Sequence, residues 1–181
     1  MTKTILTYGL IGGVISIIGY IITFLTGHED MTNAMIIGFA SMIVGFSLIF
    51  VGIKNYRDKQ AGGSITFLKA LKMGLLMSLI TSTIYVFVWL IVFYNYYPNF
   101  AQQYGDKIVE QMREAGSTAE QINAQIAENA KVVEDYKNPL MVILYTYVEI
   151  LWVGIIFTLL AALILKKKPK QNKEEFKAWA E

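Results

Sequence analysis

The stretch LMVILYTYVEILWVGIIFTLLAALIL, residues 140–165, decides the fold class of this chain. Its one charged residue is Glu149, and its other side chains are apolar or uncharged. A helix rises about 1.5 Å per residue, so about 20 apolar residues cross a hydrocarbon core of about 30 Å. A helix on the surface of a soluble domain would instead show a polar stripe. The stretch therefore predicts a transmembrane helix.

Three more apolar blocks of similar length lie at residues 5–25, 34–53 and 71–94. Of the 181 residues 55% are hydrophobic and 17% charged, against about 45–50% and about 25% in soluble domains. We predict an all-α polytopic membrane protein with four transmembrane helices, at about 5–26, 34–53, 67–96 and 139–166. The first block is longer than the apolar run of a cleaved signal peptide, about 7–15 residues, and no A-x-A-like site follows it. This favours a retained span over a signal peptide.

Lys and Arg are unevenly divided among the connecting segments. Five lie between 54 and 72, three follow at 166–168, and none occurs in TGHED (26–30). The segment 97–138 has four basic residues against seven acidic ones. Short loops rich in Lys and Arg stay cytoplasmic. We therefore expect both termini, the central loop and the basic tail 167–181 in the cytoplasm, and 97–138 outside.

The basic tail has two readings. Lys166, Lys167 and Lys168, followed by Phe176 and Trp179, would suit a short helix resting on anionic lipid. The simpler interpretation is the basic flank that ends a span. The first interpretation places anionic lipid at the cytoplasmic face among the expected partners.

The segment 97–138 has the pattern of two amphipathic helices. Apolar residues recur every four positions from Phe100 to Met112, and a second apolar stripe runs from Ala119 through Ile126 to Val133. We expect an external helical hairpin between spans three and four. Its stripes would be buried on each other or on the membrane surface.

Helix ends are marked on both sides of the second amphipathic stripe. Gly116 fits the residue that follows a helix, and Ser117 with Glu120 fits a capping box. Asn138 followed by Pro139 fits the start of the fourth span.

Small residues recur at steps of three and four in the first three spans, a spacing that lets helices approach closely in lipid. They are Gly9, Gly12, Ser16, Gly19, Thr23 and Thr26 in the first span, Ala34, Gly38, Ser41 and Gly45 in the second, and Gly74, Ser78 and Thr81 in the third. We expect a compact bundle in which the first two spans form a tight antiparallel hairpin. A transport path lined by these residues is the alternative, and packing is the commoner cause.

Glu149 lies well inside the fourth span, about 24 Å from its inner end and about 12 Å from its outer end. An ionisable side chain there costs at least about 2.5–3.5 kcal/mol, so we expect it to face the bundle and find partners. Hydroxyls at a similar height predict an intramembrane polar cluster with Glu149. Its expected members are Tyr145, Thr23, Ser41, Thr81, Ser82 and Tyr85. Proton or cation coupling is the functional interpretation of this cluster, and an interhelical hydrogen bond is the structural one.

The cytoplasmic loop GIKNYRDKQAGGSITFLKALKMG, residues 52–74, is the most distinctive stretch. Gly62 and Gly63 predict a turn, and Ser64 or Thr66 can cap the third span. Two glycines before a helix can also bind phosphate, but no strand precedes them and the Walker spacing is absent.

The chain resembles domain-of-unknown-function family 4199, found in Bacteroidetes and relatives. The resemblance rests on YGLIGG (8–13), GFASMIVGFSLIFVGIKNYRD (38–58), GGSITFLKALKMGLL (62–76), YKNPL (136–140) and EILWVGIIFTLLAALIL (149–165). It implies a four-span membrane protein of bacterial origin and brings no assigned activity. We expect the protein in the bacterial inner membrane. The loop positions that carry it are Lys54, Tyr56, Arg57, Asp58, Gly63, Lys69 and Lys72. Leu68 stands where the family usually has glycine.

Three classes of function remain. A non-catalytic scaffold or regulatory module, with a membrane protein or a second copy as partner, is favoured over a small proton- or cation-coupled transporter that uses Glu149. A membrane enzyme is least favoured, because the chain shows no cluster of catalytic groups. The chain has no cysteine, and its one histidine, His28, lies beside Glu29 and Asp30 in a short loop. We expect no metal, no cofactor, no catalytic residue and no nucleic acid.

Overall fold

The structure is a computed structural model that describes residues 1–26 and 31–168. His28 and the tail residues Phe176 and Trp179 lie outside the described residues. The described helices are α1 (Thr2–Ser16), α2 (Ile18–Thr26), α3 (Met31–Gln60), α4 (Phe67–Tyr96), α5 (Phe100–Glu114), α6 (Ala119–Asp135) and α7 (Pro139–Leu165). The only β-type pairing in this part of the chain is an isolated bridge between Ile65 and Lys167.

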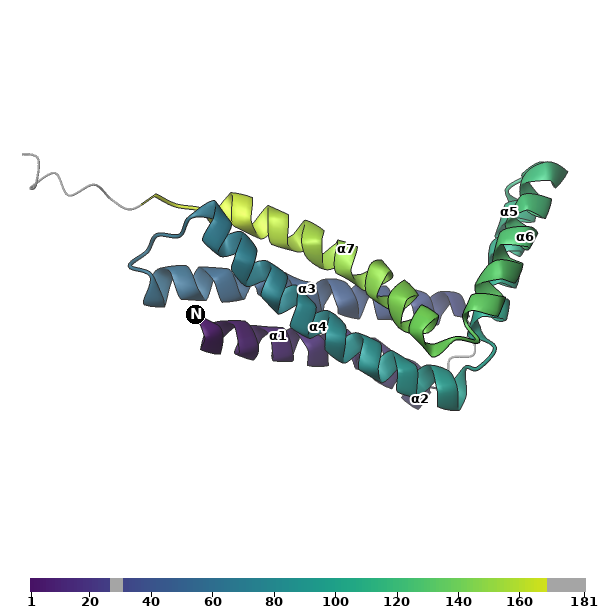
Figure 1. Ribbon diagram of the computed structural model, residues 1–181, viewed down its shortest axis with the longest axis horizontal. Coiled ribbons are helices and arrows are strands. Elements are labelled where there is room, and N and C mark those ends of the chain that lie inside the picture. Colours follow the sequence, from purple (N-terminus) through teal and green to yellow (C-terminus); the bar gives the residue numbers. More distant parts are fainter. Residues whose placement is uncertain (27–30, 169–181) are drawn as a thin grey trace, which may run out of the picture. The chain divides into compact units, whose positions relative to one another are not determined.

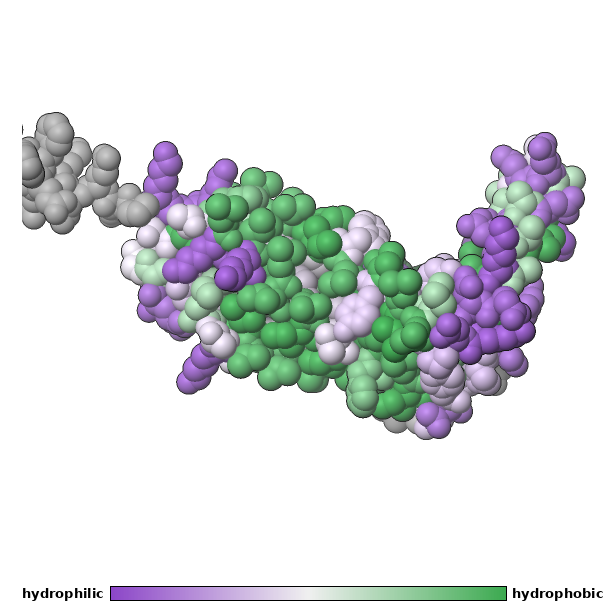
Figure 2. Space-filling view, viewed as in Figure 1, coloured by the Kyte–Doolittle hydropathy of each residue, from purple (hydrophilic) through white to green (hydrophobic). Residues whose placement is uncertain are grey.

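Four helical stretches of the described chain are long and apolar enough to cross a membrane by length and composition. They are Thr2–Ile22, Ile36–Gln60, Phe67–Tyr96 and Pro139–Leu165. Hydrophobic side chains cover the surface along these helices (Figure 2). The prediction of an all-α protein with four spans is therefore confirmed, and the chain is a multi-pass membrane protein.

The chain divides into two compact units. The first unit comprises Met1–Tyr85 and Ile150–Glu181, and the second comprises Val86–Glu149. The first contains α1 to α3, the N-terminal part of α4 and the C-terminal part of α7. The second contains the rest of α4 and α7 together with α5 and α6. The labelled helices can be followed in Figure 1.

Glycines bring α1 and α3 into close contact in the first unit. A Cβ built on Gly12 would lie 2.9 Å from the carbonyl oxygen of Gly45, and one on Gly45 would lie 2.6 Å from the oxygen of Gly12. Ser16 also lies against Gly45, at 3.1 Å from such a Cβ. Small side chains thus allow the backbones to meet, as expected for helices in lipid, where water does not drive association. The expected close pairing of the first two spans is confirmed.

The first span is not one straight helix, because α1 ends at Ser16 and α2 begins at Ile18. The Ser16 hydroxyl donates to the oxygen of Gly13 at 2.8 Å, and the Ser41 hydroxyl of α3 donates to the oxygen of Ser16 at 3.1 Å. The Tyr20 amide then donates to Ile17 at 3.1 Å, a shorter turn. Side chains that enter the backbone ladder of a helix cause such breaks. The first span, predicted at about 5–26, therefore contains a break at Ile17.

The helix ends agree with two of the three predicted caps. Gly116 has a φ of +74° and follows α5, and the Leu140 amide donates to the Asn138 side chain at 3.0 Å. The capping box of α6 is one residue later than predicted. Thr118 accepts from the Gln121 amide at 3.3 Å, and the Gln121 side chain accepts from the Thr118 amide at 2.9 Å.

The helices α5 and α6 pack side by side in the second unit (Figure 1). The most buried residues of α5 are not those of the predicted stripe. The residues that α5 buries are Ala101, Gly105 and Val109, whereas Ile126 of α6 is 44% exposed. Asn129 of α6 donates from Nδ2 to the oxygen of Gly105 at 2.8 Å. This contact between a glycine and an amide side chain had no signal in the apolar pattern.

Candidate functional site

The loop between α3 and α4 is folded back on the end of α3. Gly62 and Gly63 have φ values of +61° and +78°, a conformation that side chains with a Cβ rarely adopt. The turn brings the Gly63 amide to the oxygen of Arg57, at 2.9 Å. The predicted turn is thus present, and Gly63 has a conformational reason to be glycine.

The same loop is attached to the end of α7. The amides of Ile65 and Lys167 each donate to the other residue's oxygen, at 3.0 and 2.9 Å. Arg57 donates from Nη1 to the oxygen of Leu165 at 3.2 Å and pairs with Asp58 at 2.6 Å. A cation at the C-terminal end of a helix satisfies a free carbonyl and opposes the helix dipole. We call this set the loop clasp: Arg57, Asp58, Gly63, Ile65, Leu165 and Lys167.

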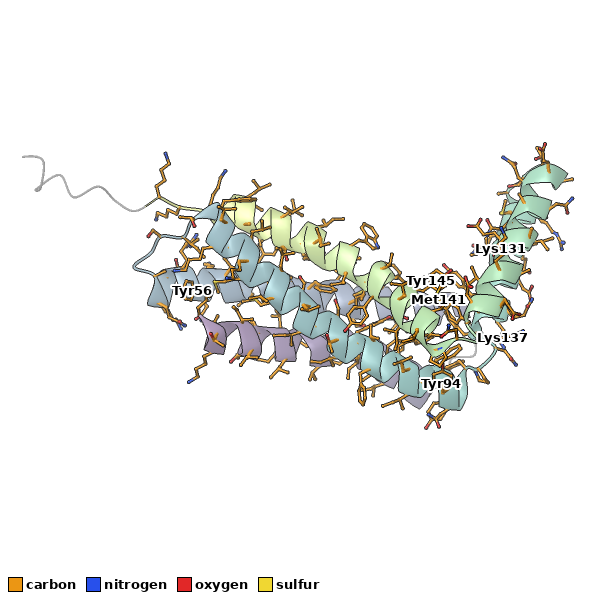
Figure 3. The ribbon with its side chains drawn as sticks, viewed as in Figure 1. Tyr56, Tyr94, Lys131, Lys137, Met141 and Tyr145 are labelled. Carbon is orange, nitrogen blue, oxygen red and sulfur yellow. The ribbon has the colours of Figure 1, made fainter. Side chains whose placement is uncertain are left out.

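Two more signature residues stand next to the loop clasp. Tyr56, labelled in Figure 3, is buried, and the Lys69 ammonium lies 5.0 Å from the centre of its ring. This distance fits a cation–π contact. Thr66, rather than Ser64, caps α4, because its hydroxyl accepts from the Lys69 amide at 3.3 Å.

Around the loop clasp the first unit carries many exposed cations. Asp58 is the only acidic residue among the described residues of this unit, and Lys54 and Lys167 lie close enough to act on its charge. Figure 2 shows hydrophilic side chains gathered over the loop. The exposed lysines of the loop and the helix ends are Lys54, Lys59, Lys69, Lys72, Lys166, Lys167 and Lys168. We call them the lysine-rich end.

The predicted partners of Glu149 in the first unit have contacts of their own. Ser41 donates to Ser16, the buried Thr81 hydroxyl donates to the oxygen of Gly9 at 3.1 Å, and the Tyr85 ring lies 5.1 Å from that of Tyr20. Ser82 is fully buried, and its hydroxyl has no hydrogen-bond partner in the part of the chain described. The side chain of Thr23 lies outside the described residues. The cluster as predicted stays a prediction.

Glu149 itself is exposed, and no described residue forms a hydrogen bond or an ion pair with its carboxylate. Tyr145, one turn earlier and labelled in Figure 3, donates instead to Asp135 at 2.6 Å. Tyr136 stacks on Tyr145 with ring centres 5.9 Å apart. Burial, and next the negative charge of Glu149, raise the pKa of Tyr136 to about 12, so this phenol stays neutral at physiological pH.

Some contacts had no signal in the sequence. The pairing of Ile65 with Lys167 joins segments about a hundred positions apart, and neither residue has a motif. Ser78 lies 3.1 Å from both the Gly154 oxygen and the Thr158 hydroxyl of α7. The spacing of small residues around Ser78 predicted close packing with another helix. It did not predict that this helix would be α7. The described residues contain no group of three or more His, Cys, Asp or Glu that could hold a metal ion.

Residues 7–167 match the sequence family described as "Protein of unknown function (DUF4199)". The chain belongs to this family. The match covers the four spans, the loop clasp and the α5–α6 pair. No curated protein and no solved structure matches the chain significantly. The family thus agrees with the resemblance found in the sequence and leaves the function to be argued from the residues.

Proposed function

We propose that this family member is a non-catalytic scaffold or regulatory module of a bacterial inner membrane, with both termini cytoplasmic. The observation that carries this proposal is the lysine-rich end. Many exposed cations, with Asp58 as the one acid among the described residues of the first unit, suit a surface covered with lipid phosphates. A membrane protein or a second copy is the expected partner within the bilayer.

The loop clasp gives the lysine-rich end a defined arrangement. The two hydrogen bonds between Ile65 and Lys167 hold the start of the tail beside the α3–α4 loop. Lys167 and its neighbours Lys166 and Lys168 then add to the charge of the loop. Each cation near an anionic surface contributes about 1 kcal/mol, so a fixed group binds more strongly than scattered lysines.

The lipid contact is tested in nanodiscs with and without phosphatidylglycerol. We expect anionic lipid to raise the unfolding temperature of the protein, and the increase to shrink when Lys166, Lys167 and Lys168 are all changed to Gln. The matched control changes Lys131 and Lys137, two exposed lysines of the second unit. An equal loss in the control variant, or no effect of anionic lipid on the natural protein, would argue against this role.

A small proton- or cation-coupled transporter is the second candidate. The observation that favours it is Glu149, the single charged residue of α7. Proteoliposomes containing the protein would then pass protons or cations, and Glu149→Ala would abolish the flux. If no flux is detected although circular dichroism shows that the protein is folded, the scaffold or regulatory module is the better proposal.

A further inference from the structure

The side chain of Arg57 is held in place at the end of α3. Only 17% of it is exposed, and its Nη1 donates to the oxygen of Leu165 at 3.2 Å. Its Nε and Nη2 donate to the two carboxylate oxygens of Asp58, at 2.6 and 3.2 Å. The guanidinium therefore presents one fixed edge with two donors, a geometry that binds a carboxylate or a phosphate through two oxygens.

The Asp58 carboxylate on this edge is open to solvent. Its side chain is 43% exposed. Asp58 is the next residue of the same helix, and adjacent positions of a helix do not face each other. An ion pair as exposed as this one contributes little to stability, because water and salt screen it. A second anion can therefore replace Asp58 on the edge of Arg57.

Two more cations surround the place that Asp58 occupies. Lys54 lies one turn earlier on α3, and Lys167 is held beside the loop by its two hydrogen bonds with Ile65. Both lysines lie close enough to act on the charge of Asp58. One carboxylate thus stands among three cations. The place is an anion site with an excess of positive charge, filled by a side chain of the chain itself.

Apolar surface adjoins this anion site. Ile164, the residue before Leu165, is 67% exposed, and Leu68, three residues after Ile65, is 73% exposed. Both lie near the ends of membrane-spanning helices, where acyl chains meet the headgroup region. A phosphate that carries acyl chains finds charged and apolar partners here, whereas a free phosphate uses only the charged ones.

We propose that the Nε–Nη2 edge of Arg57 binds the phosphate of an anionic phospholipid, with Lys54 and Lys167 beside it. Asp58 is an internal competitor for this edge. This role rests on the lipid contact proposed above and gives that contact a defined site. A phospholipid phosphate has two unesterified oxygens, which match the two donors of Arg57. Lysines that bind lipid only through their summed charge would give Arg57 and Asp58 no special part.

The test follows the unfolding temperature of the full chain in nonionic detergent while phosphatidylglycerol is added. The dependence on lipid concentration gives an apparent dissociation constant. Asp58→Asn removes the competitor, so this constant should fall about tenfold, the factor expected for one charged hydrogen bond gained by the lipid.

Thr2→Lys is the matched control, because it changes the net charge by the same amount as Asp58→Asn. Thr2 is exposed at the same end of the first unit, since its neighbour Met1 donates to Gln60 at 3.2 Å. The control should change the dissociation constant by about threefold at most. An equal gain in affinity from both variants would overturn the proposal, because net charge alone would explain it.

Arg57→Lys keeps the charge but replaces the two-donor edge with a single ammonium. It should weaken lipid binding, and the double variant of Arg57→Lys with Asp58→Asn should lose the tenfold gain. A gain that persists in the double variant would overturn the proposal. If Arg57→Lys does not fold, the comparison of Asp58→Asn with Thr2→Lys still decides it.

Inorganic phosphate tests the source of the phosphate group. In large excess over phosphatidylglycerol it should leave the apparent dissociation constant of the lipid unchanged, because it lacks acyl chains. Displacement of the lipid would overturn the lipid as ligand and assign the edge to a free phosphate. The nanodisc experiment above asks whether anionic lipid stabilises the protein at all. Stabilisation there, with no difference between Asp58→Asn and Thr2→Lys, would remove only this site and leave the proposed function standing.

Discussion

Glycine serves the two units of this protein in different ways. In the first unit Gly12 and Gly45 place backbone against backbone, with a hypothetical Cβ on either closer than 3.0 Å to a carbonyl oxygen. In the second unit Gly105 admits the side chain of Asn129, which donates to its oxygen at 2.8 Å. The comparison teaches that the space beside Gly12 and Gly45 is filled by backbone, which cannot move aside, whereas the space beside Gly105 is filled by a polar side chain that can.

The largest effect is expected for Gly45→Ala. The new Cβ would meet the Gly12 oxygen at 2.6 Å, and backbone cannot turn aside as a side chain can. Overpacking costs about 1–3 kcal/mol and occasionally more, and alanine returns about 1 kcal/mol of helix propensity. Because the backbone cannot yield, the upper end of this range applies, and we expect a net loss of about 2 kcal/mol in the free energy of unfolding. Titration of detergent-solubilised protein with dodecyl sulfate measures it.

Gly38→Ala is the matched control in the same helix. A Cβ on Gly38 would meet no atom of the described residues within 4 Å, so the substitution should be neutral or stabilise the helix by up to about 1 kcal/mol. If both alanines destabilised the protein alike, the α1–α3 contact would not depend on the close approach at Gly12 and Gly45.

A smaller effect is expected for Gly105→Ala in the α5–α6 pair. The new Cβ would lie 2.9 Å from the Asn129 side chain, which must leave its hydrogen bond. Overpacking and the lost bond together outweigh the helix propensity gained, so we expect a loss of about 1.5 kcal/mol.

The double variant Gly105→Ala with Asn129→Ala shows whether the two effects share one cause. It should lose less stability than the sum of the two single variants, because the side chain that clashes is gone. Additive losses would mean that Asn129 does not fill the space beside Gly105. This would remove the contrast with the backbone contact of the first unit.

The sequence predicted the spans well and their contacts less well. Length and apolarity determine a span locally, so the four spans were confirmed. The break at Ile17 lies beside Ser41 of another helix, whose hydroxyl is 3.1 Å from the Ser16 oxygen, and no local pattern contains this contact. In the candidate site the turn at Gly63 was predicted, but the pairing of Ile65 with Lys167 was not. The exposure of Glu149 likewise depends on packing that no spacing rule supplies.

The capping box of α6 shows how close two local solutions can be. Ser117 with Glu120 and Thr118 with Gln121 both fit the motif, and the structure uses the second pair. Thr118→Ala should cost about 1 kcal/mol, the usual effect of losing such a cap, and Ser117→Ala should cost much less. Helical content followed by circular dichroism during unfolding measures both. A larger loss for Ser117→Ala would restore the predicted register and move the start of α6 by one residue.

The smallest effect is expected where a hydroxyl bridges two spans of the first unit. Thr81→Val keeps the shape of the side chain but removes the hydrogen bond to the Gly9 oxygen. Interhelical hydrogen bonds in membranes contribute about 0.6 kcal/mol on average, because the separated helices find other partners. Thr146→Val is the control, since that hydroxyl donates to Val142 of its own helix at 2.7 Å. We expect Thr81→Val to lose about 0.6 kcal/mol more than Thr146→Val in the same dodecyl sulfate titration. A loss above about 2 kcal/mol would exceed the usual range for such bonds and would make this hydroxyl a main link between α1 and α4.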